Sequence, residues 1–225
     1  LSRLQQRFVS DVSHELRTPL TTIRMAADVL YEQRKEMPAQ LRRSSELLRD
    51  QLDRFELLLG DLLEISRFDA GAAQLETESV DIREVVAGAV AAALPLAEAG
   101  GSRIVVDVPE EPCIAACDPR RIERIVRNLL SNAIEHGEGR PIDVRVAGEH
   151  TSVAVSVRDH GHGLGDADLD RVFDRFWRAD PARARTLGGT GLGLSIALED
   201  TRLHGGRLAV WGRPGQGAVF RLTLP

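Results

Sequence analysis

The sequence predicts a long helical hairpin followed by a mixed α/β domain. Three observations support this division. Apolar residues recur every three or four positions up to about residue 66, a connector rich in Gly and Ala follows at residues 69–74, and strand and helix signals alternate beyond it. With 225 residues, 43% of them hydrophobic and 28% charged, the chain is large enough for two domains of unequal size that each bury a core.

The first expected helix runs from near residue 1 to about Gln33. Apolar residues spaced by three and four define one face of this helix, as in an amphipathic helix. They are Val12, Leu16, Leu20, Ile23, Ala27 and Leu30.

A second helix is expected after a break at residues 35–38. Its seam alternates by four and three, which is a heptad pattern, at Leu41, Ser45, Leu48, Leu52, Phe55, Leu59, Leu62 and Ser66. Further apolar residues widen the stripe beyond what one partner helix covers: Leu47, Leu58, Leu63 and Ile65. Because a lone hairpin would leave leucine side chains in water, we expect a homodimer through a four-helix bundle.

Beyond the connector the pattern is that of an α/β domain. Strands are expected at residues 103–108, 113–117, 142–147, 152–158, 207–211 and 218–223. Helices are expected at residues 82–99, 119–135 and about 191–203. Asp118 and Pro119 are a good start signal for the middle helix, as N-cap and first-turn residues. The stretch between Gly163 and Gly188 exceeds the usual loop length, as mobile lids often do.

Composition excludes several classes of function. The net charge is −5, and neither part of the chain has the positive excess that direct nucleic-acid binding requires. Lys35 is the single lysine, so a phosphate loop of the GxxxxGK[ST] type and a lysine nucleophile elsewhere are excluded. Cys113 and Cys117 are four apart in an expected strand, about 13 Å, too far for a disulfide. The longest apolar run, residues 85–97, is too short to span a bilayer.

The first helix presents a candidate nucleophile. His14 is rotated by about 200° from Val12, away from the apolar seam, and precedes Glu15. The carboxylate can hold the imidazole in one tautomer, and the Thr18 hydroxyl lies one turn away. Pro19 is expected to bend or loosen the helix beside His14. His14 is interpreted either as a nucleophile or, more simply, as a surface histidine on a coiled coil. The other motifs of the chain are needed to distinguish these interpretations.

The middle helix carries a polar stripe with a spacing of four: Arg124, Asn128, Asn132 and His136. Asn is a poor helix former, so two Asn residues one turn apart need a reason. A solvated face is one interpretation. The other is that the two amide oxygens meet a hydrated Mg²⁺ and its phosphates.

Two glycine-containing segments complete the candidate site. Asp159 directly follows an expected strand and can accept a hydrogen bond from an amino group such as that of adenine, while Gly161 and Gly163 let a flat ring approach. His160 and His162 alone are weak evidence for a metal site. The run from Gly189 to Gly193 leads into a helix, an arrangement that turns backbone N–H groups toward phosphate.

Together these segments resemble the conserved boxes of sensor histidine kinases. The H, N, first glycine, F and second glycine boxes correspond, in the family's order, to residues 8–20, 128–133, 159–163, 173–176 and 189–194. The resemblance implies a two-helix hairpin dimerising into a four-helix bundle, followed by a two-layer α/β sandwich of the GHKL (Bergerat) ATPase type. It implies a dimerisation and phosphotransfer domain at residues 1–67, a connector at 68–78 and a catalytic ATP-binding domain at 79–225.

The resemblance also implies roles for single residues. His14 is the residue phosphorylated by ATP, Glu15 orients or deprotonates its ring, and Thr18 positions water during dephosphorylation of a partner. Asn128 and Asn132 hold Mg²⁺, with Asn128 also in the catalytic set. Nucleotide binding falls to Asn128, Asn132, His136, Asp159, Gly161, Gly163, Gly189, Thr190, Gly191, Leu192 and Gly193.

The implied partner is the receiver domain of a response regulator, which accepts the phosphoryl group on an aspartate. Residues 172–204 are similar to the actinobacterial MtrB-type kinases, which implies a regulator of the MtrA type. Because the chain begins inside a helix, a sensor, linker or membrane anchor is expected before it, which makes the chain the cytoplasmic portion of an inner-membrane sensor.

Two departures from the family pattern stand out, because many relatives have Lys and Tyr where this chain has Glu135 and His136. Glu135 would repel phosphates, so it either points away or marks weaker nucleotide binding, and His136 replaces the contact of the aromatic hydroxyl. Two alternative functions stay open: a GHKL-type ATPase, and a nucleotide-binding dimeric scaffold without covalent phosphorylation.

Overall fold

The computed structural model describes the backbone of residues 2–149, 151–178 and 189–225, and side chains from Leu16 on, apart from that of Arg17. The chain divides into two compact units, residues 1–73 and 74–225, and each is described by itself. None of the helices in the described ranges is both long enough and apolar enough to cross a membrane.

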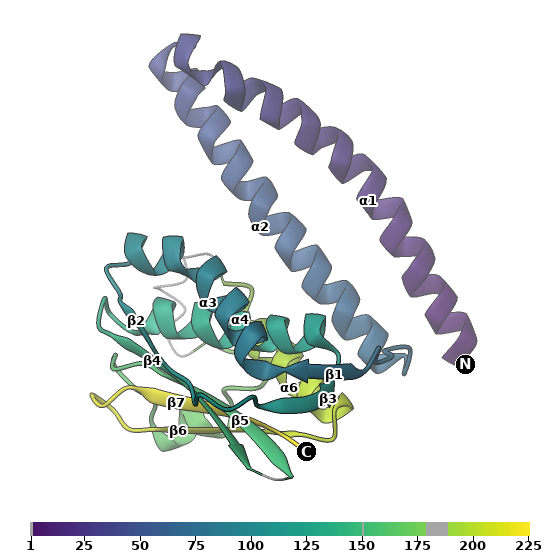
Figure 1. The fold of residues 1–225 in the computed structure, drawn as a ribbon. Coiled ribbons are helices and arrows are strands. Elements are labelled where there is room, and N and C mark those ends of the chain that lie inside the picture. Colours follow the sequence, from purple (N-terminus) through teal and green to yellow (C-terminus); the bar gives the residue numbers. More distant parts are fainter. Residues whose placement is uncertain (1, 150, 179–188) are drawn as a thin grey trace. The chain divides into compact units, whose positions relative to one another are not determined.

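The first unit is a hairpin of two long helices (Figure 1). Helix α1 (Ser2–Glu32) and helix α2 (Ala39–Asp69) are joined by a 3₁₀ turn, η1 (Gln33–Glu36), so both expected helices are confirmed. The helical backbone continues through Pro19. Pro19 cannot donate the hydrogen bond to the carbonyl of Glu15, but it does not end the helix.

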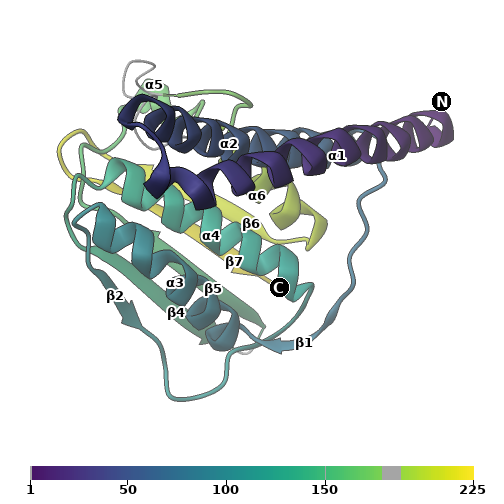
Figure 2. The same ribbon diagram turned by 90° about the horizontal axis from the view of Figure 1, so that it is seen from above.

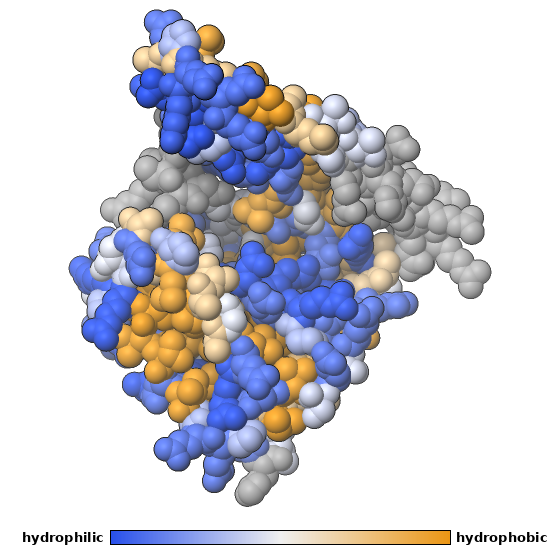
Figure 3. Space-filling model, turned by 45° about the horizontal axis from the view of Figure 1, so that its top comes forward, coloured by the Kyte–Doolittle hydropathy of each residue, from blue (hydrophilic) through white to orange (hydrophobic). Residues whose placement is uncertain are grey.

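Few apolar side chains of the hairpin are buried within one chain. Leu20, Ala27 and Leu52 form a small buried cluster, with Leu59 packed against it. Most other seam positions are exposed, including Leu48 at 40% and Phe55 at 52%. The apolar residues exposed on α1 and α2 are Leu16, Ile23, Met25, Val29, Leu30, Leu41, Leu47, Leu48, Phe55, Leu57, Leu58 and Leu62. Figure 3 shows orange atoms among the blue ones along this hairpin.

Helix α2 ends in a Schellman motif, in which Gly71 supplies the left-handed residue (φ +63°). The amide of Ala72 donates to the carbonyl of Arg67 at 2.9 Å, and that of Gly71 donates to the carbonyl of Phe68 at 2.9 Å. The first residues after α2 are therefore tied to its last turn.

The second unit is a two-layer α/β sandwich. Its five-stranded sheet has the order β2-β4-β5-β7-β6, with β2 and β4 parallel and the other neighbours antiparallel. These strands are β2 (Ile104–Asp107), β4 (Ile142–Glu149), β5 (Ser152–Arg158), β6 (Arg207–Gly212) and β7 (Ala218–Leu224). One face is covered by α3 (Ile82–Ala99), α4 (Pro119–His136) and α6 (Gly193–Leu203) (Figures 1 and 2). The predicted fold class is confirmed.

Alternation along the strands builds the core between the two layers. In β5, Val153, Val155 and Val157 are buried, whereas the intervening residues are partly exposed. Phe220 of β7 and Leu129 of α4 belong to the same buried cluster. Cys113 and Cys117 are buried free thiols, and burial raises the pKa of Cys117 to about 11.

Three features differ from the sequence-based expectations. The short strand β1 (Glu78–Asp81) was not expected, because it lacks apolar alternation, and it pairs with β3 (Ile114–Cys117). The long stretch after Gly163 contains a four-residue helix, α5 (Asp166–Leu169), and its residues 179–188 lie outside the described part of the chain. Helix α6 begins two residues later than expected, because Gly191 has a positive φ of 72°.

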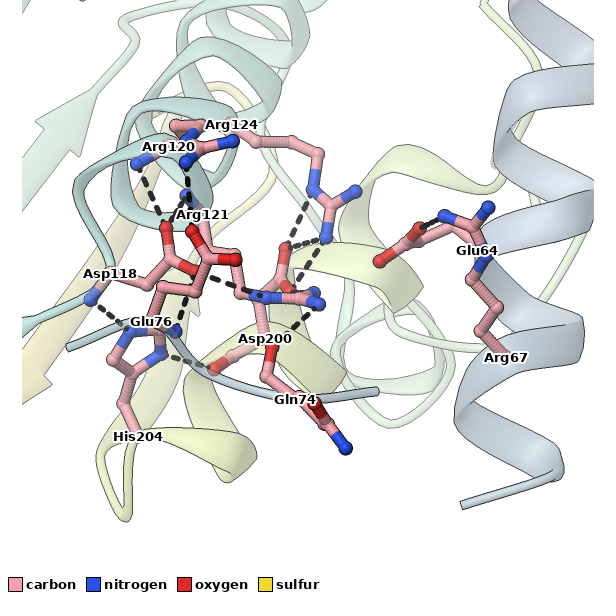
Figure 4. A network of polar contacts seen from close by, with 10 residues as sticks. All are labelled: Glu64, Arg67, Gln74, Glu76, Asp118, Arg120, Arg121, Arg124, Asp200 and His204. Carbon is pink, nitrogen blue, oxygen red and sulfur yellow. Dashed lines mark hydrogen bonds and ion pairs between the residues drawn. The ribbon is translucent and has the colours of Figure 1, made fainter. Parts of the chain in front are cut away.

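A buried carboxylate joins α4 to α6 (Figure 4). The Asp200 side chain is fully buried, and it accepts hydrogen bonds from Arg121 Nη1 at 2.7 Å and Arg124 Nε at 2.8 Å. Burial raises the pKa of Asp200, and the two guanidinium groups oppose that rise. His204 extends the network, because its Nδ1 bonds the Asp200 carbonyl oxygen and its Nε2 accepts from the Asp118 amide at 3.1 Å.

We expect Asp200→Asn to lower the free energy of unfolding by about 3 kcal/mol, because it removes the fully buried anion that pairs with two partly buried guanidinium groups. Urea denaturation of the chain measures the loss. Glu199→Gln is the matched control, since Glu199 makes a more exposed ion pair with Arg202 at 2.7 Å on the same helix; its change should stay within about 0.5 kcal/mol. Equal effects from both variants would contradict the structural role of Asp200.

Candidate functional site

The polar face of α4 contacts the start of α6. The Asn128 side chain donates a hydrogen bond from Nδ2 to the Gly193 carbonyl oxygen at 2.8 Å. Asn132, one turn further along α4, is half-buried, and its amide has no hydrogen-bond partner in the described part of the chain. Asn128 thus fixes the loop before α6, while Asn132 is available to a ligand.

The loop from Gly189 to Gly193 leads into the N-terminus of α6. Thr190 Oγ1 accepts a hydrogen bond from the Leu192 amide at 3.2 Å, and the Gly191 carbonyl accepts from the Phe176 amide at 2.9 Å. Within the described residues, no side chain caps this end of α6. Its first-turn amides and helix dipole therefore favour an anion such as phosphate.

Asp159, at the end of β5, is almost fully buried (2% exposed). Its Oδ1 accepts a hydrogen bond from the Gly161 amide at 2.9 Å. The second carboxylate oxygen has no hydrogen-bond partner among the described residues. A buried acceptor with free capacity is the group expected to read an amino group such as that of adenine.

The glycines after Asp159 pack closely against the chain's own backbone. A Cβ atom on Gly161 would lie 1.8 Å from the carbonyl oxygen of His136, and one on Gly163 would lie 1.9 Å from that of Arg213. These residues are glycine because the chain's own backbone approaches them closely. Their expected place beside a flat ring stays a prediction.

The histidines of this region are separate groups. His136 is half-buried, and its ring meets that of His162 edge-on, with centroids 5.3 Å apart. Burial lowers the pKa of His136 below its ordinary value. His160 instead pairs with Asp143, with 2.8 Å between Nε2 and Oδ2. The described residues contain no group of three His, Cys, Asp or Glu side chains that could hold a metal ion.

Glu135 lies beside the glycine loop but is paired. Its Oε1 is 2.7 Å from Nη2 of Arg178, and the same guanidinium donates to the carbonyl oxygen of Gly189. A Cβ atom on Gly189 would lie 2.9 Å from Glu135 Oε2. Glu135 therefore does not point away from the loop, and its charge is compensated by an arginine.

Comparison with known proteins decides the family. A model of the His Kinase A (phospho-acceptor) domain matches residues 4–71, and a model of the histidine kinase-, DNA gyrase B- and HSP90-like ATPase matches residues 117–225. The chain is 58% identical over 222 residues to the sensor histidine kinase MtrB of Mycobacterium leprae, covering 99% of this chain and 40% of that protein. The chain belongs to the sensor histidine kinase family.

Other histidine kinases share the sequence pattern and the fold. AfsQ2 of Streptomyces coelicolor is 38% identical over 98% of this chain and 42% of its own length. The crystal structure of full-length ShkA in complex with AMPPNP superposes with a TM-score of 0.84 at 28% identity, over 97% of this chain and 45% of that one. The chain thus spans about two fifths of these curated relatives and carries both domains of a histidine kinase core.

The residues of the phosphoacceptor segment lie on α1. The backbone at His14 and Glu15 is helical, but their side chains lie outside the described part, so the outward orientation of His14 stays a prediction. Thr18 is exposed, and its carbonyl oxygen accepts a hydrogen bond from Thr22 Oγ1 at 3.3 Å.

The residues of the polar stripe expected on α4 make different kinds of contact. Arg124 binds Asp200 and is structural, whereas Asn128, Asn132 and His136 lie along the candidate site. Sequence reasoning missed the partner of Glu135. A signal was present, because Arg178 is a basic residue two positions after the F box, but its contact across 43 positions was not visible.

We expect Gly161→Ala to weaken nucleotide binding at least about 10-fold, because the added methyl group must displace the backbone at His136. Isothermal titration with ATP measures the affinity. Gly165→Ala is the control, since a Cβ there meets only the Asp168 side chain, at 3.5 Å. Unchanged binding in Gly161→Ala would show that the loop after β5 does not shape the site.

The imidazole of His136 should titrate below pH 6.5, since burial lowers its pKa. As the pH falls through about 6.5, the unfolded chain takes up this proton first, so the folded state loses stability. The midpoint is measured by NMR of the ring protons, and His136→Phe should reduce the acid loss of stability. A midpoint at or above 6.5 would count against a buried, neutral ring.

Proposed function

We propose that this chain is the catalytic core of a sensor histidine kinase that transfers the γ-phosphoryl group of ATP to His14. The observation that carries the proposal is the presence, in one chain, of a phosphoacceptor-type hairpin and an ATPase-type domain. That domain offers a nucleotide the free acceptor of Asp159, the unengaged amide of Asn132 and the loop before α6.

In the proposed reaction an imidazole nitrogen of His14 attacks the γ-phosphorus. The new N–P bond forms as the bond to the bridging oxygen breaks, and ADP leaves with the electron pair. A neutral imidazole is a competent nucleophile near pH 7. Glu15, the next residue, orients the ring or takes its proton. Alignment of the reacting groups supplies most of the catalysis.

The nucleotide is held by groups from three elements. Asp159 accepts from the adenine amino group, and the loop of Gly189, Thr190, Gly191, Leu192 and Gly193 faces the phosphates. His136 adds a neutral ring beside the base. Asn132, together with the remaining Oδ1 of Asn128, fits a hard cation that prefers oxygen ligands. Mg²⁺ bound there neutralises phosphate charge.

The phosphoryl group then passes from His14 to an aspartate of a response regulator receiver domain. Similarity to MtrB supports a regulator of the MtrA type. Thr18, one turn after His14, positions water when the partner is dephosphorylated.

Dimerisation through a four-helix bundle explains the exposed stripe on the hairpin. The exposed leucines continue along α2 from Leu41 to Leu62, a length that a second hairpin covers. Sensor kinase relatives support placing the core on the cytoplasmic side of a membrane protein.

Incubation of the chain with γ-labelled ATP and Mg²⁺ tests the proposal. We expect label on the protein that is lost in acid and survives alkali, as a phosphoramidate does, and that is absent in His14→Gln. Asn132→Ala should abolish labelling while the chain stays dimeric by light scattering, because the change lies outside the hairpin.

Each alternative has its own result. Released phosphate without labelled protein indicates a GHKL-type ATPase. Nucleotide binding without either product indicates a dimeric scaffold. Normal labelling of Asn132→Ala would remove the metal-binding role of that residue.

A further inference from the structure

The ion pair of Glu135 and Arg178 lies beside the glycine loop that is proposed to face the phosphates of a nucleotide. The two side chains are 20% and 23% exposed, and Nη2 and Oε1 are 2.7 Å apart. The pair is thus partly shielded from water, where charges interact more strongly than at the open surface.

Contacts along α4 place this pair. At one end of the polar face, Asn128 binds Gly193. Two helical turns further along α4, Glu135 lies against Gly189. Asn132 lies between them in the same spacing of four and three. The glycine loop therefore follows the face of α4 that bears Asn128, Asn132 and Glu135.

The base-reading end of the site adjoins the same turn of α4. A Cβ atom on Gly137 would lie 3.8 Å from the Asp159 side chain, and the carbonyl of His136 abuts Gly161. A nucleotide whose base meets Asp159 and whose phosphates reach Asn132 has to pass the Glu135 carboxylate.

We infer that Glu135 is a built-in competitor of the nucleotide phosphates for Arg178. This inference rests on the proposed function and names a further positioning residue of that site. Without nucleotide, Glu135 holds the guanidinium against Gly189. When phosphates enter, Arg178 leaves Glu135 for them, and the carboxylate turns to solvent. Glu135 thereby sets how strongly the site distinguishes nucleotides by their number of phosphates.

Charge favours the exchange in this direction. A triphosphate offers several negative charges and oxygens that a planar guanidinium can bind in pairs, whereas Glu135 offers one carboxylate. Breaking the existing pair and leaving a nearby carboxylate both weaken phosphate binding. The resulting affinity for ATP is lower than the same site would have with a neutral residue at position 135.

Calorimetric titration with ATP, ADP and adenosine tests the inference, in the presence of Mg²⁺ and in the chain carrying His14→Gln so that ATP is not consumed. We expect Glu135→Gln to tighten ATP binding about 3- to 10-fold, the range for a partly shielded ion pair. ADP should gain less, and adenosine, which has no phosphate, should bind unchanged.

Arg178→Gln provides the converse measurement. It should weaken ATP binding about 10-fold and leave adenosine binding unchanged. Glu123→Gln and Arg171→Gln are the matched controls, since Glu123 lies on the same helix away from the loop and Arg171 pairs with Asp174. Adenosine binding also reports that each variant is folded.

The inference is overturned if Glu135→Gln leaves ATP binding unchanged, if adenosine and ATP shift equally, or if Arg178→Gln binds ATP as tightly as the parent. These results would leave the proposed function intact, because ATP would still bind. Failure of the parent chain to bind ATP would instead contradict the proposed function itself.

Discussion

The packing of α4 against α6 is the constraint on which the site depends. The two helices run antiparallel, because Arg121 and Arg124 near the start of α4 bind Asp200 near the end of α6, and Asn128 further along α4 binds Gly193 at the beginning of α6. A fully buried carboxylate tolerates only a geometry that keeps both guanidinium groups in place. The position of the glycine loop relative to Asn132 follows from this fixed pairing.

The pairing of charges in the candidate site also determines how the site interacts with an anion. The Glu135 carboxylate would by itself repel a phosphate, yet its ion pair with Arg178 leaves this part of the site close to neutral. The half-buried His136 is driven toward its neutral form, which removes another charge from beside the base. In the proposed binding mode the site attracts the nucleotide through amides, a helix end and a displaceable guanidinium, without a permanent excess of positive charge.

Local sequence patterns predicted most of the fold, because periodicity and capping act over a few residues. The bounds of α3 and β5 agree with the expectation at both ends, and Asp118 caps α4 as its residue type indicated. β1 was not predicted, because its pairing with β3, rather than its own sequence, makes it a strand. Likewise the pairing of Arg121 with Asp200, 79 positions apart, left no local trace. The residue types of the site were visible; which of them touch each other was not.

The joint between the two units has less freedom than its small residues suggest. The amide of Ala72 is bound back to α2, while the carbonyl of Gln74 accepts a hydrogen bond from Arg121 at 3.1 Å. Ala73 is the residue left between these two attachments. Restraint on the backbone therefore extends from both sides almost to the boundary between the units, although a run of Gly and Ala would by itself indicate a longer unrestrained segment.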